Sequence, residues 1–313
     1  MYGIKDSQYL ILGTIGILII SSELFVYLYS PVSAHNFSIN ESAAFLAMTD
    51  ELKAEVQLVQ QNSANNNMSM ASEHADKALA LLSENVTKEI AERNQRLADD
   101  LRMALTSIKA STESASSNDT SSDISFLISD TNDIIDEIVV SRIDPEQLNN
   151  SIIQALRTVE LIDQLLINYG DAYAVGFDMT NMSMMMTGSN NDGMNSMSST
   201  NTSMGNEDGG NMSKGSMLMN NNTNSGTFLV NITDYQTAQA IAMKIKEVFD
   251  GQLVDASSAA SSGTTSQSND NLASAVQELI NKVDSKASPI DVMTIVHTKL
   301  HPNLITAFNL ELR

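Results

Sequence analysis

The chain has 313 residues and is strongly acidic, with 38 Asp and Glu against 17 Lys and Arg, so it repels nucleic acid phosphates and anionic lipids and attracts cations. The absence of cysteine excludes a disulfide framework, a thiolate metal site and a thiol nucleophile. Aromatic residues are scarce and tryptophan is absent, which favours helix packing over a β-sandwich and predicts an all-α fold.

The first segment of the chain predicts export. The run from Tyr9 to Tyr29 is apolar and long enough to cross a bilayer. Val32 and Ala34 suit a signal peptidase, and cleavage after Ala34 would make His35 the new N-terminus. The alternative is that residues 1–34 remain as an uncleaved membrane anchor. In both cases we expect the rest of the chain to lie outside the cytoplasmic membrane.

Five amphipathic helices are predicted between residues 35 and 176, and we expect them to form one bundle. Ser38 and Glu41 have the spacing of a capping box before the first helix. Pro145 stands at the first position of the last one. The predicted helices are Asn40–Gln61, a second from about Ser69, Asn85–Ala110, Ile124–Ile143, and a fifth that ends near Tyr169.

The composition changes between residues 177 and 226, where Met, Asn, Ser and Gly replace aliphatic residues. Such a segment cannot bury a core and is predicted to be disordered. Residues 227–313 are predicted to form a C-terminal helical region that packs on the bundle. Its expected elements are a short strand at Thr227–Ile232, a helix to about Phe249, a Ser-rich linker at 256–270, and helices at Leu272–Val283 and Pro289–Leu300.

Methionines are concentrated in this low-complexity segment, where there is no core for them to fill. Thioethers are soft, neutral ligands that favour Cu(I), so the cluster indicates copper binding. Compositional drift or an oxidation sink are the alternatives. The candidate ligands are Met179, Met182, Met184, Met185, Met186, Met194 and Met197.

Histidines supply a second set of candidate ligands. His297 and His301 are four residues apart on a predicted helix, so both project from one face, and Met293 lies one turn earlier. Met70 and His74 repeat this step on another helix. We call each of these two sets, Met293 with His297 and His301 and Met70 with His74, a stripe. If the two stripes face each other, they form a mixed imidazole–thioether site. The alternative is that these are ordinary surface histidines.

His35 is the third candidate. If cleavage follows Ala34, the α-amine and the imidazole of His35 could chelate copper together. A copper-brace enzyme also needs a second histidine on a suitable scaffold, usually a β-sandwich, which we do not expect here. We find no P-loop, Rossmann, nucleophile-elbow or HExxH motif, and we therefore predict a protein that is not an enzyme.

A resemblance supports the copper hypothesis. The junction Ala34-His35, the opening Asn36-Phe-Ser38-x-Asn40-Glu41-Ser42-Ala43, the acidic helices and the methionine cluster resemble exported helical proteins of ammonia-oxidising archaea. Those organisms rely on copper enzymes outside the membrane. The methionine segment also resembles Met-rich segments of periplasmic copper-resistance proteins. Neither resemblance carries over a catalytic residue.

The sequence therefore predicts an extracytoplasmic protein that buffers, stores or delivers copper. Its expected partners are copper ions and an extracytoplasmic copper protein or envelope component, with no nucleic acid and no membrane contact beyond the N-terminal segment. The alternative is a cell-surface interaction module or sensory ectodomain without a metal role. Sequons such as Asn85-Val-Thr87 are compatible with its glycosylation.

Overall fold

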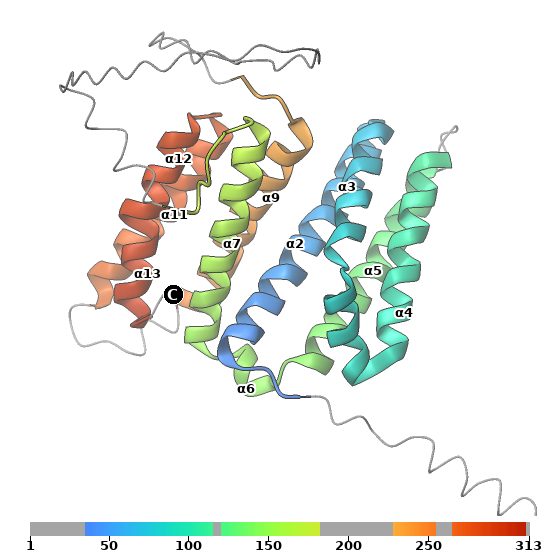
Figure 1. Cartoon of the computed structure of the whole chain (residues 1–313), viewed down its shortest axis with the longest axis horizontal. Helices are drawn as coiled ribbons and strands as arrows, with labels where there is room; N and C mark the ends of the chain where they lie inside the picture. Colours follow the sequence, from blue (N-terminus) through green and yellow to red (C-terminus); the bar gives the residue numbers. More distant parts are fainter. Residues whose placement is uncertain (1–34, 115–119, 182–227, 255–264, 311–313) are drawn as a thin grey trace, which may run out of the picture.

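The computed structural model describes residues 35–114, 120–181, 228–254 and 265–310, and within them the fold is all-α without a β-strand. The predicted export segment and the methionines between residues 182 and 227 lie outside the described residues. None of the described helices is both long and apolar enough to cross a membrane. The helices are arranged as two packed groups side by side (Figure 1).

The first bundle consists of α2 (Ile39–Ala64), α3 (Met68–Leu81), α4 (Glu84–Ser114) and α5 (Thr120–Arg142). Leucine and isoleucine recur along α4 at three- and four-residue steps, which gives the helix one apolar face. That face and the apolar sides of α2, α3 and α5 form one continuous core that includes Val56, Leu101 and Ile135. The apolar periodicity of the sequence correctly predicted all four helices.

The second bundle consists of α7 (Ser151–Ala172), α9 (Ile232–Val248), α11 (Thr265–Asp284), α12 (Pro289–Ile295) and α13 (His301–Phe308). The expectation that the first five helices form one bundle is wrong for the fifth. Most apolar side chains of α7, such as Leu161 and Leu165, are buried in the second core against α9 and the C-terminal helices. Periodicity identifies an apolar face but not the helix that covers it. The two bundles meet where α2 packs against α7 and α9.

The helix predicted from Pro145 is interrupted after one turn. Pro145–Leu148 form the short α6, and α7 begins afresh at Ser151. Asn150 caps the new helix by accepting hydrogen bonds from the backbone N–H groups of Ile152 and Ile153. The capping box at Ser38 and Glu41 is confirmed, and the Ser288 side chain caps α12 by accepting a hydrogen bond from the Asp291 N–H group.

The C-terminal region differs from the sequence prediction in two details. Residues 228–231 are not a strand, because they have no neighbouring strand to pair with, and Val230 and Asn231 instead donate their N–H groups to the Ala172 carbonyl. The linker expected at 256–270 is shorter, since α11 already begins at Thr265. Two π-helical turns, η1 (Phe249–Leu253) and η2 (Val296–Leu300), follow α9 and α12 directly.

Candidate functional site

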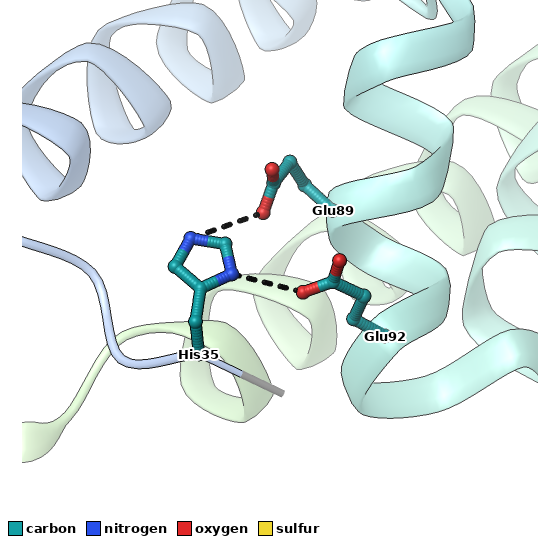
Figure 2. A group of neighbouring side chains, drawn as sticks. All are labelled: His35, Glu89 and Glu92. Carbon is teal, nitrogen blue, oxygen red and sulfur yellow. Dashed lines mark hydrogen bonds and ion pairs between the residues drawn. The ribbon is translucent and has the colours of Figure 1, made fainter. Parts of the chain in front are cut away.

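His35, Glu89 and Glu92 form the candidate metal site (Figure 2). Glu89 and Glu92 are three residues apart on α4, so they project from the same face toward His35, which lies just before α2. The His35 Nδ1 atom is 3.0 Å from Glu92 Oε2, and its Nε2 atom is 3.8 Å from Glu89 Oε2. One ligand atom from each residue lies within 4.8 Å of the others. The three groups could therefore bind one ion.

Arg142, at the end of α5, holds His35 against α4. Its side chain is fully buried and its guanidinium lies 3.5 Å above the centre of the Phe37 ring. Nη1 donates to the His35 carbonyl at 2.9 Å, and Nη2 donates to Glu89 Oε2 at 2.7 Å. Residues 35–37 are thus tied to the body of the first bundle, so that the site is built before any ion binds.

Carboxylates dominate the surroundings of His35. Glu41 Oε1 lies 3.9 Å from the His35 Nε2 atom. The backbone and side-chain hydrogen bonds from Ser38 lower the pKa of Glu41, which keeps this carboxylate ionised. The nearby Arg93 guanidinium donates to the Asn36 amide oxygen at 2.7 Å. Three carboxylates surround the imidazole, and the Arg142 guanidinium, whose Nη2 atom lies 3.5 Å from His35 Nε2, offsets one of these negative charges. Imidazole with carboxylate is a donor set for Cu(II), Ni(II) or Zn(II).

Sequence reasoning identified His35 but missed both glutamates. In the sequence, Glu89 and Glu92 are two of many acidic residues on α4, a pattern that is typical of a solvated helix face. Their three-residue spacing was the available signal. It is common on acidic helices, and only the folding of residues 35–37 onto α4 distinguishes this pair.

His74 is not a surface residue or part of a metal-binding stripe. It is completely buried, with Nδ1 2.7 Å from Glu55 Oε2 and Nε2 2.9 Å from Gln236 Oε1. Its helix α3 belongs to the first bundle, whereas His297 and His301 lie in the second (Figure 1). The two predicted Met-and-His stripes therefore do not form one site.

The neighbouring hydrogen bonds show that the Nε2 atom of His74 is a hydrogen-bond donor. Asn62 Nδ2 donates at 2.9 Å to the Leu58 carbonyl, which can only accept, and the same amide nitrogen donates at 3.0 Å to Gln236 Oε1. Gln236 consequently presents an oxygen to His74, whose Nε2 must donate. Because Nδ1 is paired with the Glu55 carboxylate, both ring nitrogens of His74 are taken up by protein partners.

A buried polar cluster surrounds this histidine at the junction of the two bundles. Lys77 donates to Asn168, Asp234 and Thr237 at 2.7, 2.7 and 2.9 Å, and the Thr237 hydroxyl donates to Glu55 at 2.7 Å. These contacts connect α2 and α3 with α7 and α9. The role of the cluster is to join the bundles.

His297 and His301 do come together, as the sequence predicts. Their ring centroids are 5.3 Å apart with the planes at 70°. His297 lies in the π-helical turn η2 and is almost fully buried, and its Nε2 atom donates to the Met179 carbonyl at 3.0 Å. Burial and the nearby His297 lower the pKa of His301 to about 4, so that this imidazole is neutral at physiological pH.

The methionines of the described residues do not form a thioether site. Met179 and Met293 are buried in the second core, and the Met179 sulfur packs against Gly170. Both fill a gap between helices, as flexible methionine side chains commonly do. Met70 is partly exposed on α3. Met182, Met184, Met185, Met186, Met194 and Met197 lie outside the described residues.

No family model, curated protein or solved structure matches the chain. The functional assignment therefore depends on the chemistry of the sites themselves.

Proposed function

We propose that the chain is an extracytoplasmic, non-enzymatic copper-binding protein, with His35, Glu89 and Glu92 as the copper site of its folded body. The observation that carries the proposal is the convergence of one imidazole and two carboxylates within 4.8 Å of one another. Copper(II) binds nitrogen and oxygen donors more tightly than the other divalent first-row metals.

Processing of the N-terminus would complete this site. If the export segment is removed after Ala34, the α-amine of His35 becomes a ligand next to its own imidazole. The amine and Nδ1 belong to the same residue, so they can chelate one ion. Glu92 Oε2, at 3.0 Å from Nδ1, lies within the range expected for two ligand atoms on one ion. Amine, imidazole and carboxylate then form a tetragonal N,O set, which Cu(II) favours.

The methionine-rich segment has a complementary role in the proposal. Its thioethers capture Cu(I) without losing a proton, whereas the His35 site takes Cu(II). One chain can thus bind both oxidation states, which suits a protein that buffers, stores or delivers copper to an extracytoplasmic partner.

The test is a Cu(II) titration of two forms of the chain by isothermal calorimetry. One form begins at His35 and the other retains Ala34 before it. We expect the first to bind more tightly, and Glu89→Gln with Glu92→Gln to weaken its binding at least tenfold. Asp99→Asn with Glu113→Gln, on the same helix, is the matched control and should leave the affinity unchanged. Binding weaker than micromolar, or unaffected by the two glutamate substitutions, would overturn the proposal.

A second candidate function is a protein-interaction module, which three exposed apolar side chains favour. Phe126 and Val140 on α5 are 72% and 69% exposed, and Met103 on α4 is 63% exposed. Exposed apolar groups that form a contiguous patch mark contact sites, whereas single exposed apolar residues are common. Sedimentation of the chain over a range of concentrations tests self-association. A mass that rises with concentration in the native chain, but not in Phe126→Ser, supports this function, and a constant mass argues against self-association.

A further inference from the structure

A second cluster of ligand-type atoms lies in the second bundle, far along the chain from His35. His301 begins α13 and Asp163 lies on α7, and these helices pack against each other. The His301 Nε2 atom is 3.9 Å from Asp163 Oδ1. This distance is too long for a hydrogen bond. Two atoms that bind one tetrahedral zinc ion at about 2.0–2.2 Å each lie about 3.3–3.6 Å apart, so a movement of a few tenths of an ångström brings this pair to one ion.

His301 Nε2 is buried and has no hydrogen-bond partner among the described residues. Buried polar atoms are nearly always paired, because leaving one unpaired costs about 1–3 kcal/mol. The ring nitrogen of a neutral imidazole that carries no proton is a metal ligand. An ion between this nitrogen and Asp163 would satisfy the unpaired atom.

The neighbouring carboxylates also lack a compensating cation. Glu160 and Asp178 both raise the pKa of Asp163, after the larger effect of burial. Within the described residues, no lysine or arginine forms an ion pair with any of these three carboxylates. Elsewhere in the molecule, the lysines and arginines pair with acidic groups repeatedly. The excess of negative charge at this place favours a bound cation.

His297 supports the same interpretation. Its Nε2–H donates to the Met179 carbonyl, which leaves Nδ1 as the atom with a free lone pair in the neutral ring. Metal-binding histidines characteristically donate their other ring N–H to a backbone carbonyl or a carboxylate. His297 also lies in a π-helical turn, a feature that is frequent at functional sites.

We propose that His301 and Asp163 form a second metal site, for a divalent first-row cation that takes nitrogen and oxygen ligands, with His297 beside it. The site uses no residue of the His35 cluster and does not depend on the copper proposal. The Asp163 side chain is 36% exposed and gives the ion a path from solvent, whereas His301 is mostly buried. Two protein ligands leave positions for water or for a partner's ligand.

The test uses Zn(II), which imidazole and carboxylate ligands bind, and the chain that carries Glu89→Gln and Glu92→Gln. In this background we expect one Zn(II) per chain, with affinity lowered at least tenfold by Asp163→Asn and unchanged by Asp171→Asn on the same helix. Imidazole nitrogen NMR should show the His301 signals shift on Zn(II) addition, while those of His74 stay in place. Circular dichroism verifies that each variant folds.

The outcomes separate the two proposals. Zn(II) binding that Asp163→Asn leaves unchanged, or unshifted His301 signals at saturating Zn(II), would overturn this site and leave the His35 proposal intact. Loss of Cu(II) binding at His35 would leave the Zn(II) result here unaffected.

Discussion

Glu51 is a buried acid whose ionisation should destabilise the fold. Its side chain on α2 is 7% exposed, and burial, followed by repulsion from Glu55 one turn away, raises its pKa from 4.5 to about 7. The folded state therefore binds this proton more tightly than the unfolded chain does. As pH rises from about 5 to 8, Glu51 loses this proton in the folded chain. Its ionisation lowers the free energy of unfolding by about 3 kcal/mol.

Glu51→Gln removes the charge and keeps the size and hydrogen-bonding capacity of the side chain. We expect the variant to be more stable than the native chain by about 3 kcal/mol at pH 8 and nearly equal to it at pH 4. Urea denaturation across this range, followed by circular dichroism, measures the difference. Glu113→Gln changes an acid that is 60% exposed and should show no such pH dependence. A Glu51→Gln variant that is no more stable at pH 8, or a difference that is constant with pH, would refute the reasoning.

Three further substitutions test the structural roles assigned above. His74→Leu removes one partner of the buried Glu55, which keeps its hydrogen bond from Thr237, and should lower the free energy of unfolding by about 1–3 kcal/mol in urea, with metal titrations of the folded protein unchanged. Ser38→Ala removes the N-cap of α2 and should cost about 1 kcal/mol by the same measurement; no loss would argue against the cap. Met179→Ala opens a cavity in the second core and should cost about 2–5 kcal/mol, while calorimetry should detect the same number of copper ions per chain. A lost copper ion would instead indicate that Met179 is a ligand.

The helices could be predicted from the sequence because their signals are local. Three- and four-residue apolar steps located α2 to α5, and the capping box at Ser38 located the start of α2. The partner of α7 could not be predicted, since its apolar face would fit either core. The π-helical turn η2 was also missed, because one extra residue per turn barely alters the apolar pattern around Val296–Leu300.

The candidate sites were predictable only where ligands are close in sequence. His297 and His301 are near one another on consecutive helical turns, and the structure brings them together. The environment of His74 depends on Glu55 and Gln236, which come from other helices. Its burial therefore could not be predicted from the local sequence. Glu92 likewise meets His35 only through tertiary packing.

The most direct test of the copper proposal is a crystal structure of the chain beginning at His35, grown with one equivalent of Cu(II) and recorded at the copper absorption edge. The proposal predicts one strong anomalous peak within about 2.0–2.2 Å of the His35 amine, His35 Nδ1 and a carboxylate oxygen of Glu92, with Glu89 adjacent. A crystal with copper bound elsewhere, and with His35 still paired to the two glutamates alone, would contradict it.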